Sequence, residues 1–213
     1  MRRVLVDPHA PQRDAIQEAA KWIRLGRLVV LPTDTLYGLA ADPFRADAVA
    51  RVFAVKGRGP DRALPLIAAD VDQVTTHLGP LSAAGARLAE KFWPGPLTLL
   101  VPATAALARD VSGGTGRVGV RVPGEDISRA ICRAAERPIT ATSANRSGQA
   151  ATADPDEVER TLGDDVELLI DAGKTRGGLP STIVDIAEGK PRLVRVGAIP
   201  WDEIQAWLTD LTA

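Results

Sequence analysis

Hydrophobic residues along the chain recur in two patterns, one typical of helices and one typical of buried strands. Apolar residues at positions 15, 16, 19, 20 and 23 repeat at helical spacing, and Gly26 is well placed to end that helix. The next apolar run, over 28–31, is continuous, stops at Pro32 and predicts a buried strand. Helix-like and strand-like segments go on alternating in this way along the chain.

Polar residues mark several of the later helix starts. Asp47, Ser82 and Asp154 each precede a helical pattern and are predicted N-caps, and Pro155 suits the first helical position. Interleaved helices and strands without a long linker predict one α/β domain over 1–213, with a mixed sheet flanked by helices. The pattern places further helices at 47–56, 82–93, 126–136, 154–162 and from 200 onward, and strands at 64–68, 97–101, 118–122, 139–142, 167–170, 182–186 and 193–196.

Composition narrows the class of protein. The chain has 213 residues, of which 45% are hydrophobic and 25% charged, as in a soluble globular domain with a full core. No apolar run approaches the ~20 residues that span a bilayer, and no signal-peptide core follows Met1. We therefore expect a cytoplasmic protein without a membrane partner. The net charge of −1 argues against a protein that coats nucleic acid, although it permits a local basic cavity.

Cysteine and histidine are too few for several common kinds of site. Cys132 is the only cysteine, so an internal disulfide is excluded, and its apolar neighbours predict a buried side chain. His9 and His77 are far apart and have no nearby acidic or cysteine partner in the sequence. We therefore expect two surface histidines and neither a zinc cluster nor a Ser-His hydrolase.

Two glycine-containing segments match nucleotide-binding motifs only in part. Residues 114–119 fit GxGxxG, but β-branched residues and Pro123 follow where a helix is required, which favours a strand. Residues 173–175 resemble the end of a P-loop, yet Leu168 stands at the position of its first glycine and no helical pattern follows. We expect no Rossmann site and no P-loop, and a loop over 174–179 that can act as a lid.

A more informative set of polar residues stands where predicted elements end. Lys56 and Arg58 end a helix, Ser143 and Asn145 follow a buried strand, and Arg195 follows another. Each has a structural alternative when taken singly, because helix dipoles favour basic C-termini and turns favour Ser and Asn. Together they supply the cations, hydroxyl and amide that a phosphate site built from several loops needs.

The order of seven segments resembles the YrdC-like family, the threonylcarbamoyl-AMP synthases. The resemblance covers about residues 12–200. By this resemblance we expect the short form of the family, without the extra C-terminal domain of the longer branch. Ala63 and Val196 depart from it, since many relatives have proline at both positions. The segments are Leu31-Pro32-Thr33-Asp34-Thr35-Leu36-Tyr37-Gly38-Leu39, Lys56-Gly57-Arg58, Phe92-Trp93-Pro94-Gly95-Pro96-Leu97-Thr98, Gly119-Val120-Arg121-Val122-Pro123, Thr142-Ser143-Ala144-Asn145-Arg146-Ser147-Gly148, Pro180-Ser181-Thr182-Ile183-Val184-Asp185 and Arg195-Val196-Gly197.

The resemblance implies a twisted mixed sheet with helices, curved around a large basic cavity. It also implies an L-threonylcarbamoyladenylate synthase, a nucleotidyltransferase that makes threonylcarbamoyl-AMP and pyrophosphate from L-threonine, bicarbonate and ATP. A separate transferase complex then moves the threonylcarbamoyl group to tRNA, and whether the synthase touches tRNA is left open. Mg²⁺ is expected with ATP, held mainly by phosphates and water, with Asp34 as a candidate outer partner.

The resemblance also assigns residues to the two substrates. Lys56, Arg58 and Arg195 supply catalytic cations and bind ATP, together with Ser143 and Asn145. Thr35, Arg121 and Ser181 are assigned to L-threonine. The types of these residues fit the chemistry. A carbamate that attacks a phosphoryl group needs positioning and charge stabilisation, which cations supply. A guanidinium can bind the carboxylate of an amino acid through two hydrogen bonds.

Two other functions remain open on the sequence alone. One is a YrdC-like module that binds RNA in a basic cavity without chemistry, which the scarcity of aromatic residues, 4%, argues against. The other is a related carbamoyl-adenylate-forming enzyme, as in the similar domain of hydrogenase-maturation proteins. Those proteins have additional domains.

Overall fold

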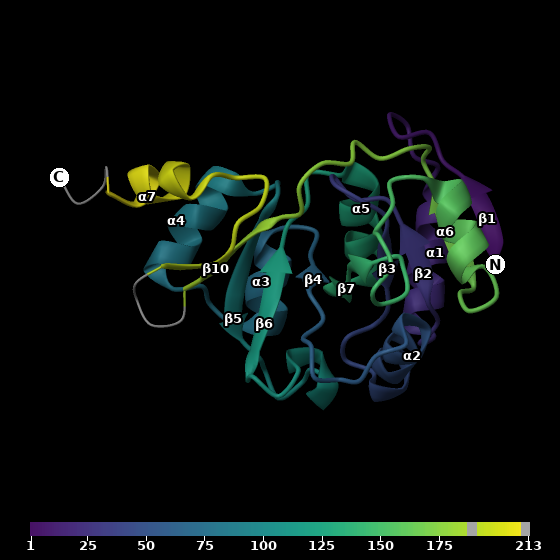
Figure 1. Cartoon of the computed structure of the whole chain (residues 1–213), viewed down its shortest axis with the longest axis horizontal. Helices are drawn as coiled ribbons and strands as arrows, with labels where there is room; N and C mark the ends of the chain where they lie inside the picture. Colours follow the sequence, from purple (N-terminus) through teal and green to yellow (C-terminus); the bar gives the residue numbers. More distant parts are fainter. Residues whose placement is uncertain (187–190, 210–213) are drawn as a thin grey trace.

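The computed structural model describes residues 1–186 and 191–209, and its strands form two sheets with parallel and antiparallel pairing (Figure 1). The five-stranded sheet has the order β1 (Arg2–Leu5), β9 (Leu168–Asp171), β2 (Val29–Leu31), β3 (Gly38–Ala40) and β8 (Thr142–Ser143). The six-stranded sheet has the order β11 (Arg192–Arg195), β10 (Thr182–Asp185), β5 (Leu97–Pro102), β6 (Arg117–Arg121), β4 (Leu66–Ile67) and β7 (Ile139–Thr140).

The predicted α/β class with mixed pairing is confirmed, but the strands divide between two sheets where the sequence pattern indicated one. In the five-stranded sheet β9 is parallel to β1 and β2, whereas β3 is antiparallel to β2 and β8. In the six-stranded sheet β5 is parallel to β10 and antiparallel to β6. That 1–213 forms one domain stays a prediction, because 187–190 and 210–213 lie outside the described residues.

Seven α-helices and one 3₁₀ turn are found in the described ranges, and their starts test the predicted caps. The Ser82 side chain accepts a hydrogen bond from the Gly85 amide at 3.2 Å, and Asp154 accepts one from Asp156, so both caps are confirmed. The Asp47 cap is wrong, because the helix begins one residue earlier and Asp47 forms an ion pair in its first turn. The elements are α1 (Arg13–Arg24), α2 (Ala46–Lys56), α3 (Val71–Leu78), α4 (Ala83–Phe92), η1 (Arg109–Ser112), α5 (Asp126–Ala135), α6 (Pro155–Leu162) and α7 (Trp201–Thr209).

Both faces of the five-stranded sheet are covered, which explains the continuous apolar run over 28–31. Val29 and Leu31 lie in one apolar cluster with residues of α1 and α5, whereas Leu28 and Val30 lie in the other with residues of α2 and the six-stranded sheet. Side chains of a strand alternate between faces, so a strand covered on both sides reads as uninterrupted apolar sequence.

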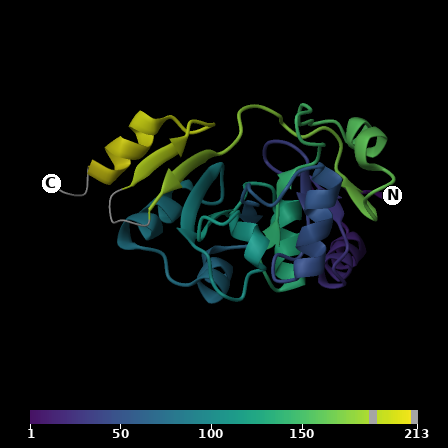
Figure 2. The ribbon, with the colours of Figure 1, turned by 60° about the horizontal axis from the view of Figure 1, so that its bottom comes forward.

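The predicted strand over 139–142 is two strands that belong to different sheets. Ile139 and Thr140 pair with β4, whereas Thr142 and Ser143 pair with β3. The chain therefore crosses from the six-stranded to the five-stranded sheet at Ala141. In Figures 1 and 2 the two sheets lie toward opposite ends of the long axis, with β10 and α7 at one end and β1 and α6 at the other.

Several smaller features of the structure agree with the sequence patterns, and others differ from them. Residues after 116 form β6 and no helix follows 173–175, as predicted for the two partial nucleotide motifs. Cys132 is fully buried, and burial raises the pKa of its thiol. His9 is exposed as expected, but His77 is half-buried, with its ring 5.5 Å from that of Phe44. The elements β1, β3, α3 and η1 were not predicted.

Candidate functional site

A cavity of about 520 Å³ lies where the two sheets approach each other. Its wall includes the loop between β2 and β3, strands β5, β6 and β8, the chain before β10, and β11. Six of the residues predicted for substrates line it together, although they are far apart in the sequence. They are Thr35, Arg58, Arg121, Ser143, Ser181 and Arg195.

Lys56 and Asn145, the other two predicted site residues, lie directly behind Ser143. Lys56 is only 3% exposed, and its ammonium donates to the Ser143 carbonyl at 2.7 Å and to Asn145 Oδ1 at 2.6 Å. Ser143 Oγ also donates to Asn145 Oδ1 at 2.6 Å. Burial and the charge of Arg58 lower the pKa of Lys56 to about 8. These three residues, the Lys56 cluster, place a buried cation one side chain away from the cavity.

The end of α2 explains how the two basic residues of one motif take different positions. Gly57 has a φ of 63°, in the left-handed region that lets a helix stop within one residue. Lys56 thus stays buried in the last turn, whereas Arg58 lines the cavity and lies over the Phe53 ring at 5.9 Å. Arg58 Nε is buried and has no hydrogen-bond partner within the described ranges.

Arg195 and Ser181 meet at the other side of the cavity. The Arg195 guanidinium donates to the Ser181 carbonyl at 2.8 Å and to its hydroxyl at 3.2 Å. The Ser181 hydroxyl also lies 2.8 Å from that of Thr98 on β5. Thr98 lines the cavity and was not among the predicted residues. A threonine inside the apolar run over 97–101 was the available signal.

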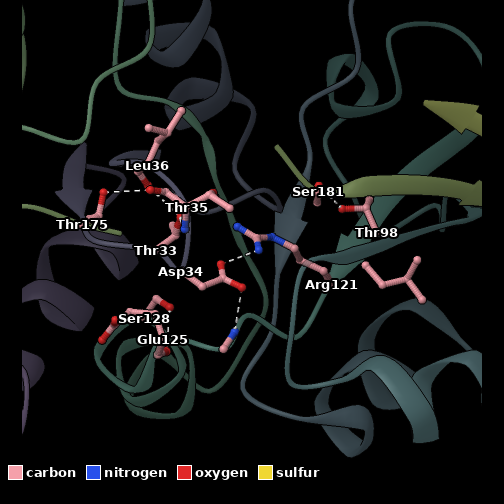
Figure 3. Close-up of polar contacts among 12 residues, drawn as sticks. Thr33, Asp34, Thr35, Leu36, Thr98, Arg121, Glu125, Ser128, Thr175 and Ser181 are labelled. Atoms are coloured by element: carbon pink, nitrogen blue, oxygen red, sulfur yellow. Dashed lines mark hydrogen bonds and ion pairs between the residues drawn. The ribbon is translucent and has the colours of Figure 1, made fainter. Parts of the chain in front are cut away.

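Arg121 lies at the end of β6 and points toward the loop between β2 and β3 (Figure 3). Its Nη1 donates to Asp34 Oδ1 at 2.5 Å, and the other carboxylate oxygen accepts from the Gly124 amide at 3.1 Å. Arg121 also acts on Arg195, because burial and the charge of Arg121 lower the pKa of Arg195. The two guanidinium groups therefore repel each other across the cavity.

The loop with Thr35 is fastened to the segment after β9. The Thr35 carbonyl accepts from the Gly177 amide at 2.9 Å and from the Thr175 hydroxyl at 2.8 Å. The Tyr37 hydroxyl donates to the Gly173 carbonyl at 2.6 Å, and burial raises its pKa. Tyr37 lines the cavity and was missed as a site residue. The predicted lid loop over 174–179 is thus held against the cavity wall at its base in this structure.

The carboxylate of Asp34, which contacts the cavity-lining Arg121, is already engaged. Both oxygens of Asp34 have partners, as described above. In the described part of the chain no three His, Cys, Asp or Glu side chains are grouped so that they could hold a metal ion. Nor does that part contain a helix long and apolar enough to cross a bilayer.

Comparison with known proteins assigns the family. The model for the Sua5/YciO/YrdC family, described as "Telomere recombination", matches residues 21–197. The chain belongs to this family. Family membership confirms the resemblance found in the sequence motifs, and the YrdC-like fold follows from the structural comparison below.

Several relatives are named threonylcarbamoyl-AMP synthase. The Pyrococcus abyssi relative is 39% identical over 190 residues, which cover 89% of this chain and 56% of the relative. The Bacillus subtilis relative is 35% identical and is also covered to 56%. The Halorhodospira halophila relative is 39% identical over 155 residues, which cover 73% of this chain and 81% of the relative. The chain thus spans little more than half the length of the first two.

Solved structures agree with the fold. The structure of P. abyssi Sua5 complexed with L-threonine has a TM-score of 0.92 at 36% identity, and the match covers 98% of this chain and 61% of that one. Escherichia coli YciO has a TM-score of 0.84 at 26% identity, with 93% and 97% covered.

Proposed function

We propose that this chain is an L-threonylcarbamoyladenylate synthase that uses L-threonine, bicarbonate and ATP. The observation that carries the proposal is the meeting of Arg58, Arg121 and Arg195 with Ser143 and Ser181 around one cavity. A volume of about 520 Å³ suits small-molecule substrates. The names of the relatives and the L-threonine in P. abyssi Sua5 support the same reaction.

Two groups of residues would divide the substrates between them. On the ATP side, Arg58, Arg195 and the Lys56 cluster would bind the phosphates and ribose. On the amino-acid side, Arg121 would bind the carboxylate, and Thr35 and Ser181 would read the hydroxyl. A site that hydrogen-bonds a substrate hydroxyl rejects analogues without it.

The proposed reaction needs little acid–base chemistry from the protein. The threonine amine and bicarbonate give a carbamate and water. A carbamate oxygen then attacks the α-phosphorus of ATP, forming the new O–P bond while the bond to the β-phosphate oxygen breaks and pyrophosphate leaves. Cations around the phosphates stabilise the charge that develops. Mg²⁺ would arrive with the phosphates of ATP, because the nearby Asp34 is engaged by Arg121 and Gly124.

The wider role is part of the same proposal. The product would pass to a threonylcarbamoyl-transferase complex that modifies tRNA in the cytoplasm. Such a product is a reactive mixed anhydride, so prompt transfer to that complex is expected.

The test is pyrophosphate release from ATP and bicarbonate, with and without L-threonine, and with L-serine and other amino acids in its place. Mass spectrometry of the product should show threonylcarbamoyl-AMP. Release that L-threonine does not stimulate would reject the synthase. Salt-sensitive RNA binding without that release would favour the RNA-binding module instead.

A further inference from the structure

Asp34 occupies a special place between the two sheets although it does not line the cavity. It lies in the loop between β2 and β3 of the five-stranded sheet, whereas its partner Arg121 ends β6 of the six-stranded sheet. The Asp34 and Arg121 side chains are 14% and 10% exposed, so water screens this pair only weakly. Figure 3 shows the Arg121 guanidinium pointing to Asp34 across the space between these elements.

The hydrogen bonds of the pair leave part of the guanidinium available. Asp34 accepts from Arg121 at Nη1 only, and its second oxygen is held by the Gly124 amide. Arginine has five N–H groups in one plane, so a second edge can still bind another carboxylate. Within the described residues the side chain of Arg121 hydrogen-bonds only to Asp34.

We propose that Asp34 is a positioning residue for the amino-acid substrate, which orients Arg121 so that its remaining N–H groups bind the substrate carboxylate. The inference rests on the proposed function, in which Arg121 binds that carboxylate. Asp34 acts through Arg121, and the Gly124 amide in turn holds the Asp34 carboxylate in place. Asp34 also offsets the repulsion between Arg121 and Arg195, which would otherwise favour a guanidinium turned away from the cavity.

The direction in which Asp34→Asn changes the affinity for L-threonine distinguishes a positioning role from a purely electrostatic effect. Asp34→Asn removes a negative charge beside Arg121, and by charge alone this should strengthen the binding of a carboxylate. If orientation matters more, the same substitution weakens binding, because an amide holds a guanidinium less firmly than a carboxylate does. We expect Asp34→Asn to raise the Kd for L-threonine about tenfold or more, and to leave the KM for ATP within about twofold.

Asp42 provides a matched control. One of its carboxylate oxygens accepts from the Phe44 amide at 2.9 Å and the other from Arg137 at 3.0 Å, the same arrangement as at Asp34. Asp42 lies outside the cavity wall and is 1% exposed. Asp42→Asn should therefore report what the loss of a buried ion pair does to stability, with no selective effect on L-threonine.

The experiment measures L-threonine binding by calorimetry for the unmodified chain, Asp34→Asn, Asp42→Asn, Arg121→Lys and the double variant with Asp34→Asn and Arg121→Lys. Because Asp34 acts through Arg121, the double variant should bind no more weakly than Arg121→Lys alone. Thermal melts and the KM for ATP accompany each variant. Tighter or unchanged L-threonine binding in Asp34→Asn overturns the proposal. An Asp34→Asn variant whose KM for ATP rises as much as its Kd for L-threonine also overturns it. So does an Asp42→Asn variant that binds L-threonine as weakly as Asp34→Asn does.

Pyrophosphate release on the unmodified chain keeps this proposal separate from the proposed function. Selective loss of L-threonine binding in Asp34→Asn, with no turnover by the unmodified chain, would support the positioning role and reject the synthase. Turnover by the unmodified chain, with unchanged L-threonine binding in Asp34→Asn, would support the synthase and reject the positioning role. An unmodified chain that does not bind L-threonine rejects both.

Discussion

Replacing Lys56 by methionine should separate activity from stability. Methionine is unbranched and nearly as long as lysine, so it can fill the same space without the charge. The substitution removes the donor to the Ser143 carbonyl and to Asn145 Oδ1, at 2.7 and 2.6 Å. Asn145 would then hold Ser143 through the hydrogen bond from the Ser143 hydroxyl to its Oδ1 and through its own backbone amide, which donates to the Ser143 carbonyl at 2.9 Å.

The expected loss of activity follows from the position of the charge. If the Lys56 cluster binds ATP, removing a charge-stabilising group should lower threonine-dependent turnover about 10²-fold, which corresponds to about 2.7 kcal/mol. The loss should fall mainly on kcat, because phosphoryl charge changes most in the transition state.

The expected change in stability is small, because two terms oppose each other. Burial lowers the pKa of Lys56 from 10.5 to about 8. That shift means that the charged form costs the folded state about 3 kcal/mol, which methionine would recover. Methionine also removes the two hydrogen bonds that the ammonium donates, to the Ser143 carbonyl and to Asn145 Oδ1, at about 1–3 kcal/mol together, although each oxygen keeps another donor. The free energy of unfolding at pH 7 should thus change by less than about 2 kcal/mol.

The pH dependence gives a second measure with a definite sign. Between pH 8 and 10.5 the unfolded chain keeps the Lys56 proton, whereas the folded chain has lost it. Unfolding therefore binds a proton, so this group makes the folded state more stable as pH rises through that range, by up to about 3 kcal/mol. Lys56→Met should lack this rise, and the exposed Lys21→Met should keep it.

Urea unfolding at pH 7 and 9.5 and the pyrophosphate assay test all three expectations. Near-normal turnover in Lys56→Met would refute a role for the ammonium in the reaction. A fall of more than about 4 kcal/mol in the free energy of unfolding would instead make Lys56 a structural residue whose loss inactivates by unfolding.

Three further predictions concern the surroundings of the cavity. Arg195→Ala should lower turnover about 10²-fold, whereas Arg192→Ala, on the same strand but outside the cavity wall, should stay within about twofold; equal loss in both would contradict the assignment. Tyr37→Phe removes the hydrogen bond to Gly173 and should lower the free energy of unfolding by about 1–3 kcal/mol. It should also speed tryptic cleavage after Lys174, and unchanged cleavage would show that this hydrogen bond does not hold the loop. Asp154→Ala removes an N-cap and should lower the free energy of unfolding by about 1 kcal/mol, measured by thermal melting. An unchanged melting temperature would contradict the role of Asp154 as a cap.

Local patterns determined most of the elements, because helix periods, caps and apolar runs depend on neighbours in sequence. The Ser82 and Asp154 caps and the strands over 97–101 and 118–122 are found within a residue or two of their predicted places. The sequence did not reveal the break near Ala141, since two short strands in different sheets have the same residue pattern as one continuous strand over 139–142.

The candidate site, like the fold, could be predicted from the sequence only in part. Residue types and motif order in the sequence were enough to select the six predicted residues that line the cavity. Only the tertiary structure decided that Lys56 stays behind the wall while Arg58 reaches it, and that Asp34, Thr98 and Tyr37 belong to the surroundings of the site. The physical reason is that burial, pKa and hydrogen-bond partners depend on residues brought together from distant parts of the chain, and spacing along the sequence carries no record of those distances.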